Sequence, residues 1–145
     1  MSNLQLFKIA VSAFIVKENR LLILQRADDE AFLPGVWEVP GGGVDEGESI
    51  TQGVLRETME EAGVSATPNE LFGFFEYVDG YHQKTVNLNF ICTMNHDSKD
   101  PDTTSGEMER AAWVSLEELY DYKFTSEIML EACKEALRLK HRSVS

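Results

Sequence analysis

A change of hydrophobic periodicity between residues 36 and 64 is the feature that most limits what this chain can fold into. The extended segment "VWEVP" ends at Pro40 and runs directly into three glycines, Gly41–Gly43. Ser49 and Gln52 then have the spacing of a capping box, which marks the start of a helix, and Gly63 is a natural stop at its far end. The chain therefore requires an extended piece, a glycine segment and a helix, in that order.

We expect this helix to be amphipathic, with an acidic stripe opposite its core face. At about 100° per residue, side chains three or four positions apart share a side of a helix. One side then carries Thr51, Val54, Leu55, Thr58, Met59 and Ala62, and the other carries Ile50, Gly53, Glu57, Glu60 and Glu61.

The remaining segments have strand patterns, followed by a second amphipathic helix. Strands are predicted at Phe7–Val16, Leu21–Arg26, Glu70–Val78, Lys84–Met94 and Glu107–Val114, with loops at Ala27–Gly35 and Asn95–Gly106. The closing helix, Ser126–Lys140, has a predicted core face of Met129, Leu130, Cys133, Ala136 and Leu137. This order predicts a single α+β (α/β) domain over residues 1–145, with a mixed β-sheet packed between helices as an α/β/α sandwich.

The charge balance limits the partners of the chain. Asp and Glu number 25 against 13 Lys and Arg, giving a formal net charge of -12. Phosphate backbones are bound by Lys and Arg, so we expect no nucleic-acid partner. An anionic protein also repels a phosphorylated small molecule, so such a substrate would need a cation between it and the protein.

Three glutamates on the acidic side, Glu57, Glu60 and Glu61, lie at positions i, i+3 and i+4. Like-charge neighbours on a helix cost only about 0.2–0.5 kcal/mol per pair, so a solvated acidic face is one interpretation. A metal site is the other, because Mg²⁺ binds one or two carboxylates together with waters and phosphate oxygens. Gly41–Gly43 favour this interpretation, since glycine lets a phosphate approach closely and can offer a backbone carbonyl to the ion.

The same residues resemble the Nudix box, a Gly, five residues, a Glu, seven residues, and then Arg-Glu-apolar-any-Glu-Glu-any-Gly-apolar. Here Gly42 and Glu48 have the first spacing, and "RETMEEAGV", Arg56 to Val64, follows after seven more residues. Every fixed residue matches, and Thr58, where the family usually has an aliphatic side chain, is the one departure. "LLILQR", "LPGVWEVPGG" and "AAWVSLEEL" also resemble the family, which implies the Nudix fold over most of the domain.

The resemblance implies a metal site and a set of catalytic residues. The carboxylates of Glu57, Glu60 and Glu61 and the carbonyl of Gly42 would bind Mg²⁺, with Mn²⁺ as an alternative. Arg56, with Glu48, would hold the acidic cluster in place. We take Glu57 as the first candidate for the general base, and Glu107 as either a further metal ligand or base, or an exposed strand-edge residue. Glu109 is interpreted as an exposed strand-edge residue.

Substrate contacts are expected on both sides of the box. Arg26 either reaches the substrate phosphates or forms a surface salt bridge, and Gly41, Gly42 and Gly43 would lie against the phosphates. Tyr77 is a candidate for lining a nucleoside pocket, as is Phe75. Trp37 is interpreted as a packing residue and His82 as a solvated turn residue.

The resemblance implies Mg²⁺-dependent hydrolysis of a phosphoanhydride bond, by a metal-activated water, in a nucleoside diphosphate linked to another group. Our first candidate is a (d)NTP or an oxidised nucleotide, which would give a nucleoside monophosphate and pyrophosphate. The alternatives are a dinucleoside polyphosphate, or ADP-ribose or a nucleotide sugar. A Nudix-fold nucleotide-binding module without catalysis is an alternative of another class, although the box keeps all its glutamates.

Cellular context is inferred from what the sequence contains. Cys92 and Cys133 lie in apolar segments and are expected to be reduced and buried. The N-terminal apolar stretch alternates with polar residues, and we expect neither export nor a membrane span. These features predict a cytoplasmic monomer or homodimer with a small-molecule nucleotide as its partner.

Overall fold

A mixed seven-stranded sheet forms the centre of the fold in the computed structural model, which describes residues 3–27, 35–104 and 108–144, with side chains as far as residue 140. The strands are β1 (Lys8–Lys17), β2 (Arg20–Arg26), β3 (Trp37–Glu38), β4 (Gly41–Gly43), β5 (Ala66–Val78), β6 (Lys84–Met94) and β7 (Met108–Val114). The helices are α1 (Ile50–Ala62), the short 3₁₀ helix η1 (Glu118–Asp121) and α2 (Glu127–Val144). The predicted fold class is confirmed.

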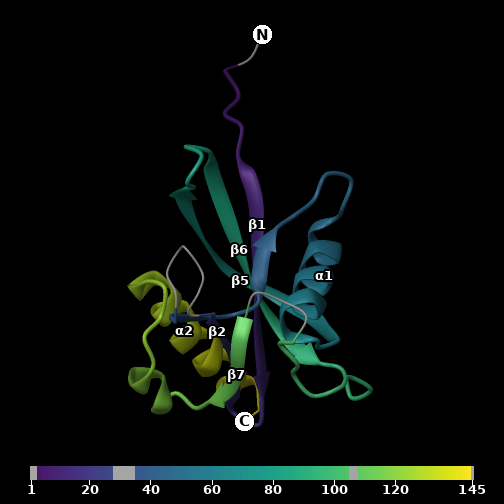
Figure 1. The fold of residues 1–145 in the computed structure, drawn as a ribbon, viewed down its shortest axis with the longest axis vertical. Helices are drawn as coiled ribbons and strands as arrows, with labels where there is room; N and C mark the ends of the chain where they lie inside the picture. Colours follow the sequence, from purple (N-terminus) through teal and green to yellow (C-terminus); the bar gives the residue numbers. More distant parts are fainter. Residues whose placement is uncertain (1–2, 28–34, 105–107, 145) are drawn as a thin grey trace.

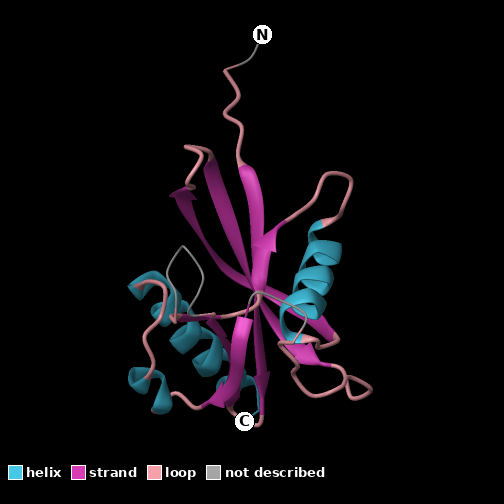
Figure 2. Cartoon of the chain, viewed as in Figure 1, coloured by secondary structure: helices cyan, strands magenta, loops and turns pink. Residues whose placement is uncertain are grey.

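The long strand β1 connects the two halves of the sheet. The strand order is β3-β2-β1-β6-β5, with β4 paired to β1 and β7 paired to β2. The pairing of β1 with β6 is parallel, whereas β2, β4 and the other paired strands run antiparallel. Figures 1 and 2 show α1 on one side of these strands and α2 on the other, which is the predicted layered arrangement.

Helix α1 begins and ends where the sequence predicts. The Ser49 side chain accepts a hydrogen bond from the Gln52 backbone N–H, and the Gln52 side chain accepts one from the Ser49 N–H, which completes the capping box. Gly63 ends the helix with a φ of 66°, in the left-handed region that favours glycine. Gly63 must also remain small, because an added Cβ would lie 3.0 Å from the Asp102 carbonyl oxygen.

The predicted core face of α1 is correct only in part. Val54, Thr58 and Ala62 are buried, and Thr58 donates its hydroxyl to the Val54 carbonyl oxygen at 2.7 Å. Leu55 and Met59 are 42% and 50% exposed, so their assignment to the core is wrong, and Thr51 is exposed as well.

The buried arc of α1 is rotated toward its acidic side, where Gly53 is also buried. A Cβ at Gly53 would lie 3.0 Å from Val44 Cγ2, so the missing side chain lets the helix approach the segment after β4. The acidic stripe therefore borders the core face instead of lying opposite it.

Two apolar clusters fill the spaces between the helices and the sheet. The cluster on the α1 side includes Val11, Ile15, Leu24 and Val54, and the cluster on the α2 side includes Phe14, Leu21, Ile23 and Val114. Of the predicted α2 core face, Met129, Cys133, Ala136 and Leu137 are buried and Leu130 is partly buried. Cys92 and Cys133 are both free and buried, as expected.

Two hairpins and one packed loop connect neighbouring elements of the fold. Glu18 and Asn19 join β1 to β2 with φ values of 53° and 62°, which is the two-residue turn that suits twisted strands. Strands β5 and β6 form the antiparallel hairpin around Asp79 and Gly80. In the Asn95–Gly106 loop, Asp102 donates its N–H to the Ala62 carbonyl oxygen at 2.7 Å, while residues 105 and 106 lie outside the described part of the chain. Residues 28–34 of the predicted Ala27–Gly35 loop also lie outside the described part of the chain.

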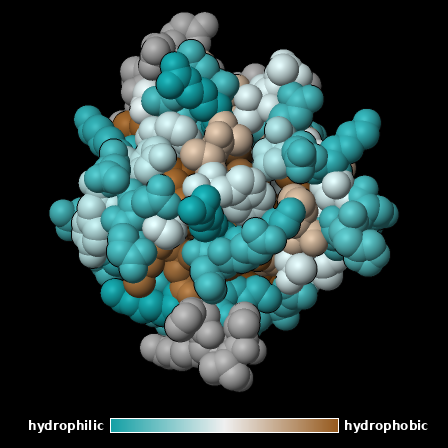
Figure 3. Space-filling view, turned by 90° about the horizontal axis from the view of Figure 1, so that it is seen from below, coloured by the Kyte–Doolittle hydropathy of each residue, from teal (hydrophilic) through white to brown (hydrophobic). Residues whose placement is uncertain are grey.

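The surface is largely polar, in keeping with the high charge. Figure 3 shows hydrophilic residues over most of the face seen from below, with small apolar areas between them. Among the described residues, no helix combines the length and the apolar character that crossing a membrane requires.

Candidate metal and nucleotide site

The glycine strand β4 brings backbone atoms against the carboxylates of α1. It pairs with the middle of β1, where Gly41 lies opposite Ser12 and Gly42 opposite Val11. The Gly41 N–H donates to Glu61 Oε1 at 2.7 Å, so β4 and the last turn of α1 are directly joined. A Cβ at Gly42 would lie 2.6 Å from the Cδ of Glu57, closer than real Cβ contacts allow.

The close contact at Gly42 yields a prediction. Replacing Gly42 by Ala is expected to push the Glu57 carboxylate out of its position and to weaken Mg²⁺ binding by about tenfold, the low end of what disturbing a metal site costs. Gly43→Ala is the matched control, because its Cβ would lie at an ordinary 3.4 Å from Lys8 Cε. Calorimetric titration with Mg²⁺ measures both, and equal affinities for the two variants would contradict this role of Gly42.

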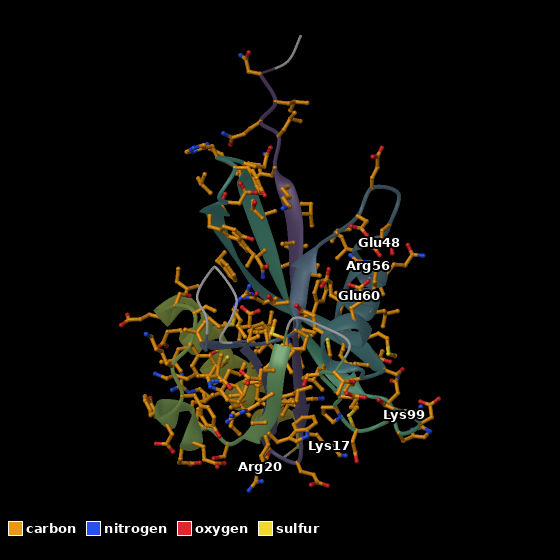
Figure 4. The ribbon with its side chains drawn as sticks, viewed as in Figure 1. Lys17, Arg20, Glu48, Arg56, Glu60 and Lys99 are labelled. Carbon is orange, nitrogen blue, oxygen red and sulfur yellow. The ribbon has the colours of Figure 1, made fainter. Side chains whose placement is uncertain are left out.

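Arg56 connects the carboxylates of the box. Its Nε and Nη2 donate to both oxygens of Glu48 at 2.8 and 3.0 Å, and its Nη2 also donates to the Gly43 carbonyl oxygen at 2.8 Å. Its Nη1 donates to Glu57 at 2.8 Å and to Glu60 at 3.2 Å. Figure 4 shows Arg56 and Glu60 on α1, with Glu48 close to them in the segment just before the helix. One guanidinium therefore holds three carboxylates and the glycine strand, as its planar fork of donors allows.

Burial and hydrogen bonding shift the pKa values of these carboxylates in different directions. The hydrogen bond from Arg56 lowers the pKa of Glu48 and raises that of Arg56 itself. Burial raises the pKa of Glu57 despite its hydrogen bond with Arg56. Burial also raises the pKa of Glu61 to about 8, and the nearby charges of Glu38 and Glu57 add to the effect, whereas the Gly41 N–H opposes it. Glu57 and Glu61 are thus largely buried carboxylates with too little positive charge around them.

The donor set fits a hard divalent cation. Within the described ranges, no three His, Cys, Asp or Glu side chains already converge as a ready-made metal cluster. Arg56 binds Glu57 and Glu60, and Gly41 binds Glu61, so each carboxylate has a protein partner. Burial raises the pKa of Glu57 and of Glu61, so a cation bound beside them would stabilise their charged forms, and oxygen ligands beside a glycine backbone suit Mg²⁺ or Mn²⁺.

A cleft of about 500 Å³ opens beside the glycine strand. Its lining includes Gly41–Gly43, the Arg26–Glu38 ion pair at 3.3 Å, and Phe75 and Tyr77 of β5. The rings of Phe75 and Tyr77 are stacked, with centroids 5.9 Å apart. This volume and mixed lining are typical of sites for small organic ligands.

The structure brings most of the predicted site residues to one region. Arg56 contacts Glu48, Glu57, Glu60 and the glycine strand, Glu61 contacts that strand separately through Gly41, and Arg26 and Tyr77 line the adjoining cleft. Glu107 lies outside the described residues, whereas Glu109 is exposed on β7. Trp37 packs edge-on against Tyr122 with centroids 5.0 Å apart, so it is a packing residue as predicted, and His82 is an exposed turn residue.

Several cleft residues were missed by sequence reasoning. Ser12, Asn87, Ser126 and Ile128 line the cleft but belong to no recognised motif, and Glu38, which lies in the family-like segment "LPGVWEVPGG", was given no role. For Asn87, the polar positions that alternate with apolar ones in "TVNLNF" were an available signal. They place a row of polar side chains on one face of an otherwise apolar strand.

Comparison with known proteins agrees with this geometry. The NUDIX domain family model matches residues 6–133. Nucleoside triphosphatase NudI of Escherichia coli is 31% identical, over 90% of this chain and 94% of its own length. Nudix hydrolase 6 of Arabidopsis thaliana is 28% identical over 88% of this chain. The match covers 49% of that protein, so this chain spans about half of its length.

A solved structure supports the same relationship. The MutT protein from Methanosarcina mazei superposes with a TM-score of 0.74 at 26% identity, covering 96% of this chain and 99% of that one. The family match spans most of the domain, and the residues of the box occupy the contacts between β4 and α1 described above. The chain therefore belongs to the Nudix family.

Proposed function

We propose that the protein hydrolyses a phosphoanhydride bond in a nucleoside diphosphate linked to another group, with Mg²⁺ or Mn²⁺ as cofactor. Nucleoside triphosphates, oxidised ones included, are the first candidate substrates, giving a nucleoside monophosphate and pyrophosphate. The observation that carries the proposal is the pair of largely buried carboxylates, Glu57 and Glu61, against the glycine strand that lines the cleft. The similarity to a nucleoside triphosphatase along nearly its whole length supports the choice of substrate.

The residues of the site have distinct roles in this proposal. Glu57, Glu60 and Glu61, with the Gly42 carbonyl, would hold the cation, which would neutralise the diphosphate and activate a water. Glu57 is also our first candidate for accepting the proton of the attacking water, because its carboxylate lies against Gly42, beside the place proposed for the cation. Arg56 and Glu48 position the carboxylates, and Gly41–Gly43 let the phosphates approach the backbone.

The cleft would hold the rest of the nucleotide. Arg26 lies at its edge beside Glu38, where its guanidinium can face the phosphates. Phe75 and Tyr77 provide an apolar wall for a base. A cytoplasmic monomer or homodimer remains our expectation for the state in which the protein acts.

A substrate panel with Mg²⁺ tests the proposal. We expect hydrolysis of nucleoside 5′-triphosphates to the monophosphate and pyrophosphate, identified by ion-exchange chromatography, and loss of turnover with EDTA. Monophosphate together with a phosphorylated second group would indicate a dinucleoside polyphosphate, ADP-ribose or a nucleotide sugar instead. Binding of nucleotide and Mg²⁺ without turnover of any compound would contradict the proposal and indicate a non-catalytic binding module.

A further inference from the structure

A row of buried neutral polar side chains crosses the floor of the cleft region. Ser12 of β1 and Asn87 and Asn89 of β6 are only 5–6% exposed. Asn87 is two strands away from the glycine strand, because it pairs with Ala10, which pairs with Gly43. At the usual strand spacing this distance is about 10 Å, so Asn87 lies beyond the position where the phosphates would bind. Buried polar side chains are costly to desolvate unless they form hydrogen bonds, so a row of them beside a cleft needs an explanation.

The hydrogen bonds of Asn87 join its amide to Ser12 and Asn89. Its Nδ2 donates to Ser12 Oγ at 2.9 Å and to Asn89 Oδ1 at 3.0 Å, which uses both amide hydrogens. Exchanging the nitrogen and oxygen of the Asn87 amide alone would place the carbonyl oxygens of Asn87 and Asn89 against each other, so the orientation of Asn87 is coupled to that of Asn89.

The oxygen of the Asn87 amide is left for a ligand. Among the described residues no donor is found for Asn87 Oδ1, and no fully enclosed side-chain oxygen or nitrogen lacks a partner. Oδ1 must therefore be accessible, and Asn87 lines the cleft. The amide presents a single acceptor, held by two hydrogen bonds behind it.

An aromatic wall lies directly beside this acceptor. Phe75 of β5 is the cross-strand partner of Asn87, and its ring stacks on that of Tyr77. Both aromatic residues line the cleft. A planar heterocycle lying against this wall would point one edge toward Asn87, and stacking on aromatic side chains accepts any base. Discrimination between bases then depends on the polar group at that edge.

We propose that Asn87 determines base specificity by accepting a hydrogen bond from the exocyclic amino group of a nucleobase, so that adenine and cytosine are preferred over their keto counterparts. This inference rests on the proposed function, which places a nucleotide in the cleft. A keto oxygen in the place of the amino group would oppose one acceptor to another, and the base would have to shift before its adjacent ring N–H could reach the Asn87 oxygen. A site built around a substrate hydrogen bond rejects an analogue that lacks the donor.

Calorimetric binding of nucleoside monophosphates tests the inference without requiring turnover. AMP and IMP differ at one edge of the base, where an amino group and a ring nitrogen without hydrogen in AMP are replaced by a keto oxygen and a ring N–H in IMP, and CMP and UMP differ in the same way. The wild-type protein is expected to bind the amino member of each pair about tenfold more tightly, the value of one buried hydrogen bond. Asn87→Leu is expected to remove the preference in both pairs.

The control is Thr85→Val, which removes a buried hydroxyl, a different polar group, from the same face of β6. Thr85 is fully buried and donates to the Gln83 carbonyl oxygen at 3.3 Å, so this variant should keep the preference. The comparison of amino and keto nucleotides in the wild type needs no variant. If Asn87→Leu does not fold, Asn87→Ser replaces it, because the shorter side chain also removes the amide oxygen.

Three results would overturn the inference. The wild type could bind the amino and keto members of each pair equally, or it could bind none of the four nucleoside monophosphates. The third result is a preference for the amino members that survives in Asn87→Leu. Hydrolysis of triphosphates is measured separately. If triphosphates are hydrolysed but the monophosphates bind without a preference for amino bases, only this inference is overturned. If the monophosphates bind with that preference but no triphosphate is hydrolysed, only the proposed hydrolysis is overturned.

Discussion

Replacing Glu57 by Gln is expected to lower kcat for nucleotide hydrolysis by roughly 10²–10⁴-fold, the range that general acid–base groups contribute. Gln keeps the size of the side chain and an oxygen that can accept from Arg56, so the fold should be retained. The charge is lost at the point where the glycine strand meets α1, with the Glu57 side chain only 14% exposed. The measurement is kcat at rising Mg²⁺ concentration, with thermal unfolding as the check on folding.

The Mg²⁺ dependence separates two roles of Glu57. If the residue acts mainly as a metal ligand, high Mg²⁺ will restore part of the turnover, because the lost affinity is overcome by concentration. If it also accepts the proton of the attacking water, kcat will remain low at saturating Mg²⁺. Glu46→Gln is the control, since Glu46 is an exposed carboxylate in the same box segment. Near-normal turnover of Glu57→Gln would remove Glu57 from both roles.

The local sequence signals were sufficient to predict α1 and the glycine segment before it, although not that this segment forms the strand β4. A capping box, a left-handed glycine and the box spacing are properties of neighbouring residues, and the structure has each of them at the expected position. The box also predicted that Arg56 would contact Glu48. Such features depend on short-range geometry, so they can be identified without knowing the tertiary structure.

The rotation of α1 on the sheet was not predictable in the same way. Helical periodicity identified an apolar side that contained Leu55 and Met59, but the structure leaves both exposed. The contact that decides the rotation lies between Gly53 and the segment after β4, where the glycine permits close approach. That contact depends on how the helix meets another element, and a residue without a side chain contributes nothing to a hydrophobic pattern.

The cleft was predicted least well, because it is assembled from distant parts of the chain. Ser12, Glu38, Asn87 and Ile128 come from β1, β3, β6 and α2, and only the sheet order brings them together. Arg26 and Tyr77 were identified through the family resemblance and from one alternating strand. A polar residue within an apolar strand, such as Asn87, suggests a special environment, but its partner Ser12 is 75 positions away.

Arg56→Gln is expected to lower the free energy of unfolding of the metal-free protein by about 2–4 kcal/mol, the order expected when one partner of a partly buried ion-pair network is removed. The Arg56 side chain is 26% exposed and holds Glu48, Glu57, Glu60 and the Gly43 carbonyl oxygen. Without it, these carboxylates repel one another around a carbonyl oxygen that has lost its donor. Urea unfolding in EDTA measures the change.

Arg56→Lys separates charge from geometry in the same experiment. Lysine keeps the positive charge, but a single ammonium cannot reach Glu48, Glu57 and the Gly43 carbonyl oxygen together, so an intermediate stability is expected. Mg²⁺ should restore part of the stability of Arg56→Gln, because a cation bound between the carboxylates reduces their repulsion. Arg110→Gln, at an exposed position on β7, is the control and should unfold like the wild type. If Arg56→Gln also unfolds at the wild-type urea concentration, the guanidinium does not hold the acidic cluster together, and the box glutamates must be positioned by their backbone contacts alone.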